Sequence, residues 1–96
     1  MRSIHPRAEQ ELIETVAFYK NSGGARVAAR FLDEFERVAS LLEEHPGFGT
    51  PFDLPRRIYP LRVFPYSLVY RPVDEGIRVL AVRHQNRRPS SSQDRS

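Results

Sequence analysis

Residues 61–84 carry the clearest alternation of apolar and polar positions in the chain, and this pattern predicts two β-strands. One face of the first strand carries Tyr66, Leu68 and Tyr70. One face of the second carries Ile77, Val79 and Ala81. The polar run from Asp74 to Gly76 supplies the turn between them. Because two strands alone are barely stable in water, a further layer must cover one face of this hairpin.

The first half of the chain supplies that layer as two helices. After His5-Pro6, apolar residues recur at helical spacing, and proline suits the first position of a helix. The run from Asn21 to Gly24 ends this helix, and a second helix is predicted from about Ala25 to Glu44. The short connection makes the two helices antiparallel neighbours.

Three shorter segments complete the predicted order of elements. Met1–Ile4 is a candidate edge strand, and Arg56–Tyr59 is a candidate strand before the hairpin. Pro46–Pro55 is rich in proline and glycine and is expected to be a loop that Phe48 and Phe52 attach to the body. The fold class is therefore α+β, with a two-helix hairpin packed on a small antiparallel β-sheet. The expected core comprises Leu12, Val16, Phe31, Phe35, Leu42, Leu68, Val79 and Leu80.

The net charge of +3 is unevenly distributed along the chain. Residues 1–45 hold six Lys/Arg and eight Asp/Glu, whereas residues 46–96 hold nine Arg and four Asp/Glu. A basic sheet half favours a nucleic-acid or acidic-protein partner, although coding bias is an alternative reason for arginine in place of lysine. The chain has no cysteine, no apolar run of about 20 residues and no signal-peptide pattern, so a cytoplasmic location is expected.

Four motifs follow one another from about Ile4 to Pro89. The first is Pro6-x-Ala8 with Glu11-Leu12, and the second is Phe31-Leu32 followed by Pro46-Gly47-x-Gly49. The third is Arg62-x-Phe64-Pro65-Tyr66-x-Leu68-x-Tyr70-Arg71, and the fourth is Ala81-Val82-x-His84-x-x-Arg87-x-Pro89. Together they resemble the RelE/ParE toxin superfamily of type II toxin–antitoxin (plasmid stabilisation) systems. The resemblance implies one two-layer domain over residues 1–89, followed by a polar tail at 90–96 that is expected to be disordered.

RelE-type members cleave mRNA on the ribosome, and the resemblance implies that most of their catalytic residues are missing here. Ile58 and Pro60 stand where those nucleases have lysines, and Ser67 stands in place of an arginine. Arg87 matches a C-terminal arginine, but the catalytic tyrosine falls near Gln93. ParE-type members also lack this set and are described as poisons of DNA gyrase, so the resemblance favours the ParE branch.

Six residues are candidates for contact with a target or with nucleic acid. Arg62, Arg83, Arg87 and Arg88 form either a basic rim or an ordinary solvated surface. Tyr66 is either a stacking platform or a core aromatic, whereas Tyr70 is expected in the core. His84 is either a general base or a strand-end histidine that bonds to the backbone, and the second interpretation is favoured. No spacing of residues indicates a metal site, and no cofactor is implied.

The resemblance implies a growth-inhibiting toxin that acts on an essential target such as DNA gyrase. It also implies a cognate antitoxin whose acidic segment folds on binding. Two alternatives stay open at this point. One is a ribosome-dependent endoribonuclease that uses Arg87 and His84. The other is a non-toxic relative that only binds its partner, because Ser91-Ser92 replace the Tyr-Trp pair found in many relatives.

Overall fold

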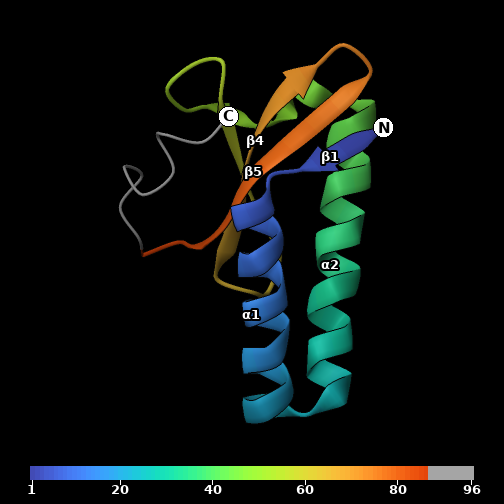
Figure 1. Ribbon diagram of the computed structural model, residues 1–96, viewed down its shortest axis with the longest axis vertical. Helices are drawn as coiled ribbons and strands as arrows, with labels where there is room; N and C mark the ends of the chain where they lie inside the picture. Colours follow the sequence, from blue (N-terminus) through green and yellow to red (C-terminus); the bar gives the residue numbers. More distant parts are fainter. Residues whose placement is uncertain (87–96) are drawn as a thin grey trace.

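The computed structural model describes residues 1–86, in which two helices cover one face of a five-stranded sheet (Figure 1). The helices are α1 (Pro6–Gly23) and α2 (Ala25–Glu44), with a short 3-10 turn η1 (Pro46–Phe48) after them. The strands are β1 (Arg2–Ile4), β2 (Thr50–Pro51), β3 (Arg57–Pro60), β4 (Tyr66–Val73) and β5 (Gly76–His84), in the spatial order β1-β5-β4-β3-β2. The predicted α+β architecture is therefore confirmed. Arg87, Arg88 and the tail predicted at 90–96 lie outside the described residues.

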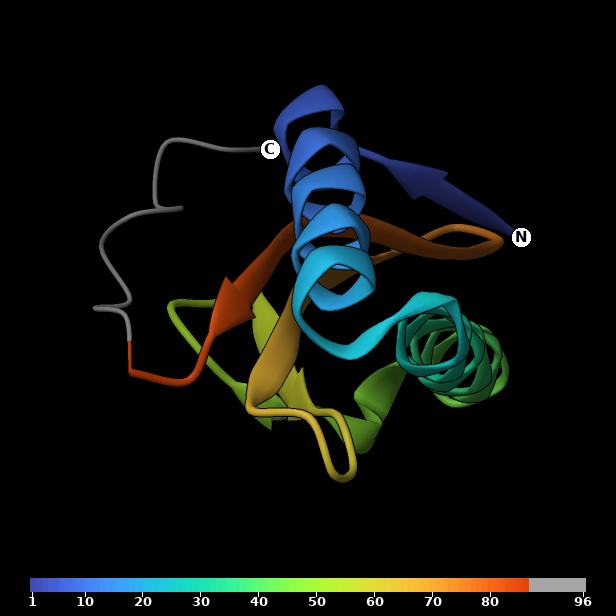
Figure 2. The same ribbon diagram turned by 90° about the horizontal axis from the view of Figure 1, so that it is seen from below.

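Local signals in the sequence set the bounds of both helices. At the start of α1, the Nδ1 atom of His5 accepts a hydrogen bond from the backbone N–H of Arg7 at 3.1 Å. Gly24, at φ 88°, separates α1 from α2 in a conformation that suits glycine. Seen from below, the hairpin lies against one side of the sheet, with α1 over β5 (Figure 2).

The main core lies between the helices and the inner face of the sheet. Leu12 and Val16 of α1 are half-buried against it. Its fully buried members come from α2 (Phe31, Phe35, Val38 and Leu42) and from the hairpin strands (Leu68, Tyr70, Ile77 and Val79). The 4-3-4 spacing of the four α2 residues explains why their side chains share one face. Burying them supplies the main hydrophobic stabilisation of the fold.

Leu80 is buried as predicted, but on the other side of the sheet. β4 and β5 shift register between Val69 and Tyr70, so that Val69 pairs with Ala81 and Tyr70 pairs with Val79. The extra residue on β5 is Leu80, which joins Val69 and Ala81 in a second cluster on the outer face. Strict alternation puts Leu80 opposite Val79, as observed. It also puts Ala81 on the face of Ile77 and Val79, and that prediction was wrong, because the β-bulge leaves Ala81 on the outer face beside Leu80.

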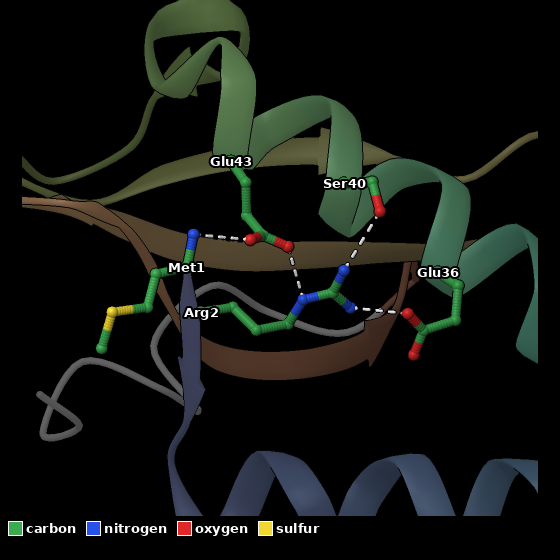
Figure 3. Close-up of polar contacts among 5 residues, drawn as sticks. All are labelled: Met1, Arg2, Glu36, Ser40 and Glu43. Carbon is green, nitrogen blue, oxygen red and sulfur yellow. Dashed lines mark hydrogen bonds and ion pairs between the residues drawn. The ribbon is translucent and has the colours of Figure 1, made fainter.

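The predicted edge strand forms, but it runs parallel to β5, so the sheet is antiparallel only from β5 to β2. Arg2 ties β1 to α2 (Figure 3). Its Nε donates to Glu43 Oε1 at 2.6 Å, its Nη1 to Glu36 Oε2 at 2.8 Å and its Nη2 to Ser40 Oγ at 3.1 Å. The parallel pairing is possible because the whole helical hairpin separates the two strands along the chain.

The segment after α2 is held mainly by Tyr70 and not by Phe48. The Tyr70 hydroxyl accepts a hydrogen bond from the Gly49 N–H at 2.8 Å and donates one to the Pro46 carbonyl at 2.7 Å. Phe52 packs on the outer cluster, as expected for an anchor. The prediction for Phe48 was wrong, because its ring is 55% exposed and stacks on His45 at 4.5 Å.

Candidate functional site

Tyr66 and His84 come together in a groove between α1 and the end of β5. They are cross-strand partners, and their rings meet edge to face at a centroid distance of 5.2 Å. The groove has a volume of about 220 Å³ and is lined by Glu11, Glu14, Thr15, Phe18, Tyr66, Val82 and His84. Helix α1 thus brings carboxylates and an aromatic ring beside two of the candidate residues.

His84 is bonded to the backbone at the end of its strand. Its Nδ1 accepts a hydrogen bond from the Asn86 N–H at 3.2 Å. A neutral imidazole that accepts through Nδ1 carries its proton on Nε2. In this arrangement Nε2 carries a proton, so it is a donor and not a base. The geometry agrees with the strand-end interpretation.

Tyr66 is half-buried at the edge of the core. Its ring lies edge to face with Phe31 at 5.6 Å and with Tyr19 at 6.2 Å. Packing of this kind fixes the ring and leaves only part of it open to the groove. Tyr70, in contrast, is fully buried, as predicted.

Arg83 lies on the outer face of the sheet, opposite His84 and Tyr66. Its side chain is only 5% exposed, and its guanidinium carbon lies 5.4 Å from the centroid of the Phe52 ring. Arg62 is exposed in the loop that precedes β4. Within residues 1–86, the predicted basic rim is therefore divided between two separate places, and Arg83 contributes no exposed charge to it.

The outer face also holds the positions at which RelE-type nucleases carry cations. Pro60 pairs with Ser67 and Ser67 pairs with Arg83, so these three residues form one row across β3, β4 and β5. The neighbouring row is apolar and consists of Ile58, Val69 and Ala81. Across both rows, the one cationic side chain is the buried guanidinium of Arg83.

The loop that carries Arg62 borders a second hollow, beside α2. This hollow has a volume of about 390 Å³ and is lined by Arg30, Asp33, Glu34, Arg37, Arg62, Val63 and Phe64. Glu34 connects two of the lining residues, Arg37 and Arg62, by hydrogen bonds. Both of its oxygens accept hydrogen bonds from Arg37 at 2.7 Å, and Oε2 also accepts the backbone N–H of Arg62 at 2.7 Å.

These contacts make the stability of the fold depend on the charge of Glu34. The hydrogen bonds from Arg37 lower the pKa of Glu34, as does the Arg62 N–H, while burial opposes them. Because the pKa is lower in the folded state, the stabilisation is present at neutral pH and is lost as pH falls through that pKa.

We therefore expect Glu34→Gln to lower the free energy of unfolding by roughly 1–2 kcal/mol at pH 7. The difference from the wild type should shrink as pH falls below about 4.5, the ordinary pKa of a glutamate. Urea melts over this pH range measure the effect, and Glu44→Gln, at an exposed position of the same helix, is the control. A difference independent of pH would refute the ionic role of Glu34.

The residues that α1 contributes to the groove were not among the candidates predicted from the sequence. Glu11, Glu14 and Phe18 follow one another at helical spacing on one side of α1, and this was the signal available. Glu11 Oε1 accepts the backbone N–H of Val82 at 3.1 Å, at an edge of β5 beyond its pairing with β1. The Glu11 carboxylate thus accepts a backbone hydrogen bond that a neighbouring strand would otherwise accept.

Two further properties limit what the described residues can do. In residues 1–86, no group of three histidine, aspartate or glutamate side chains is placed to hold a metal ion. Neither of the two helices in this part of the chain is long and apolar enough to cross a membrane.

Comparison with known proteins gives consistent matches over nearly the whole chain. The family model described as "ParE toxin of type II toxin-antitoxin system, parDE" matches residues 3–89. The proteins called Toxin ParE2 of two Mycobacterium tuberculosis strains, CDC 1551 / Oshkosh and H37Rv, are each 30% identical over 89 residues, covering 92% of this chain and 84% of theirs. A chain of the solved "Chromosomal ParDE TA system from P. aeruginosa" has a TM-score of 0.74 at 20% identity, covering 86% of this chain and 92% of that chain.

Proposed function

Because the chain belongs to the ParE toxin family of type II toxin–antitoxin systems, we propose that it inhibits growth by binding DNA gyrase and that a cognate ParD-type antitoxin neutralises it. The match to the family over residues 3–89 is the observation that carries this proposal. In this family role the toxin poisons its target by binding, and it needs no catalytic residues of its own.

The outer face of the sheet supports a binding role over cleavage of RNA. Metal-free cleavage of RNA requires an acid, a base and cations that stabilise the phosphorane. Ile58, Pro60 and Ser67 offer no cation, and the guanidinium of Arg83 is buried beside Phe52. His84 lies on the opposite face of the sheet, so it does not complete a site with that row.

The proposed antitoxin is a small protein with an acidic segment that becomes ordered on this chain. A segment that folds on binding can wrap a large surface of its partner. The structural neighbour from P. aeruginosa comes from a ParDE system, which supports a ParD-type partner.

Inducible expression in bacteria, with and without a cognate ParD-type antitoxin, tests the proposal. We expect growth to stop and a DNA-damage response to follow within the first generations, and both effects to disappear when the antitoxin is co-expressed. Phe35→Ala, which removes a core side chain, is the control for a chain that cannot fold. Normal growth with soluble, folded protein present would contradict the proposal and favour a relative that only binds its partner.

A further inference from the structure

A strained residue stands at the tip of the loop between β3 and β4. Val63 has φ 72°, in the left-handed region that a β-branched residue rarely occupies. Its side chain is also 86% exposed, so burial within the chain does not compensate for the strain. Asp53, the other non-glycine residue with positive φ in residues 1–86, is of a type that tolerates this region much better.

Contacts on both sides of Val63 hold the loop in this conformation. Leu61 is buried, and its N–H donates to the Tyr66 carbonyl at 2.9 Å. The N–H of Arg62 is held by Glu34 at 2.7 Å. Phe64 packs edge to face on Tyr19 at 5.1 Å and on Phe31 at 5.2 Å. Strained and exposed residues that their surroundings hold in place are often found where a protein binds a partner.

The hollow beside Val63 is lined by three arginines and two carboxylates, Asp33 and Glu34, so one positive charge is in excess. Arg30 and Arg62 are exposed, and neither guanidinium forms an ion pair within the part of the chain that the structure describes. The charge of Arg37 is already matched by Glu34. Together, Arg30, Arg62, Val63 and Phe64 border the hollow of about 390 Å³; we call them the Val63 surface.

We propose that the Val63 surface receives an acidic, partly apolar segment of the cognate antitoxin. An apolar side chain of that segment occupies the hollow against Val63 and Phe64, and its carboxylates bind the guanidinium groups of Arg30 and Arg62. This inference rests on the proposed function, because it places the antitoxin of that system on one surface of the chain.

Charge decides between this surface and the groove at α1. The groove carries Glu11 and Glu14 with no arginine or lysine in its lining, and would repel an acidic segment, whereas three arginines outnumber Asp33 and Glu34 in the hollow beside Val63. The Val63 surface offers two arginines, whose planar groups bind carboxylates bidentately. It also offers an exposed valine next to a half-buried aromatic ring, which is the arrangement expected for an apolar anchor.

Val63→Gly gives a test in which stability and binding change in opposite directions. Glycine adopts φ 72° without a steric penalty, so the melting temperature should rise, by about 4 °C for a domain of this size. Binding of the purified cognate antitoxin should weaken at least about tenfold, because the apolar contact is lost. Arg62→Ser and Arg30→Ser should each weaken binding, mainly by slowing association at low salt.

Two substitutions serve as matched controls. Val73→Ala shortens a valine that is 37% exposed at the other end of β4, and Arg26→Ser removes the same charge from an exposed position one turn before Arg30. Both should bind the antitoxin like the wild type, as measured by titration calorimetry and by stopped-flow association at two salt concentrations.

The possible results separate this inference from the proposed function. If the wild type binds the antitoxin and Val63→Gly and Arg62→Ser bind equally well, the inference is wrong while the proposed function stands. If the wild-type chain does not bind the antitoxin at all, the proposed function itself fails. A melting temperature for Val63→Gly at or below that of the wild type would contradict the claim of strain.

Discussion

Phe35→Ala should lower the free energy of unfolding by about 3–5 kcal/mol, the typical cost of removing a buried phenylalanine ring. Phe35 is 1% exposed at the centre of the main core, between α2 and the sheet. The loss combines the transfer free energy of the ring with the cost of the cavity that it leaves behind. Since a domain of this size is only marginally stable, a large fraction of the molecules should then be unfolded at 37 °C.

Urea denaturation followed by circular dichroism measures this loss. Phe48→Ala is the matched control, because the Phe48 ring is 55% exposed and stacks only on His45. We expect the control to change the free energy of unfolding by less than about 1 kcal/mol. A similarly small loss in Phe35→Ala would mean that the assignment of the buried face of α2 is wrong.

The chain should not cut translated mRNA at the rate of a RelE-type nuclease. Loss of one general acid or base typically lowers a rate by about 10²–10⁴, and loss of several cooperating groups lowers it further, although not additively. Ile58, Pro60 and Ser67 cannot replace the missing cations, and they share a sheet face with an arginine that is buried. His84 lies on the other face, and its Nδ1 accepts the Asn86 N–H.

Primer extension on a translated message, after induction of the chain, is the measurement for this prediction. We expect no cuts phased with the reading frame, either from the wild type or from His84→Ala. We also expect both chains to be equally toxic, because His84 makes structural contacts at the end of β5, with the Asn86 N–H and the Tyr66 ring, and no step of a binding poison needs its chemistry. Phased cuts that disappear in His84→Ala would instead make the chain a ribosome-dependent nuclease.

The sequence was informative wherever a local rule determines structure. Pro6 and Gly24 mark the bounds of α1, and the 4-3-4 spacing from Phe31 onwards predicts the buried face of α2. The alternation from Tyr66 to Tyr70 predicts their shared face, and both side chains do pack on the main core. Each of these signals lies within a single helix or strand, so it can be interpreted without knowing which distant residues the element contacts.

Features that depend on distant contacts could not be predicted in this way. The bulge beside Tyr70 places Ala81 on the outer face, and the pairing of β1 with β5 joins segments far apart along the chain. The burial of Arg83 depends on the loop that carries Phe52. The strain at Val63 is likewise set by contacts with α2, so its loop could not be identified as a candidate surface from the sequence.

The assay that tests the central claim most directly is supercoiling of relaxed plasmid by purified DNA gyrase in the presence of this chain. The account predicts that the wild-type chain inhibits supercoiling or traps cleaved DNA, that His84→Ala does the same, and that prior addition of the antitoxin abolishes the effect. Unchanged gyrase activity with a folded chain that still stops growth would contradict the account, and phased cuts in translated mRNA would then identify the nuclease as the correct alternative.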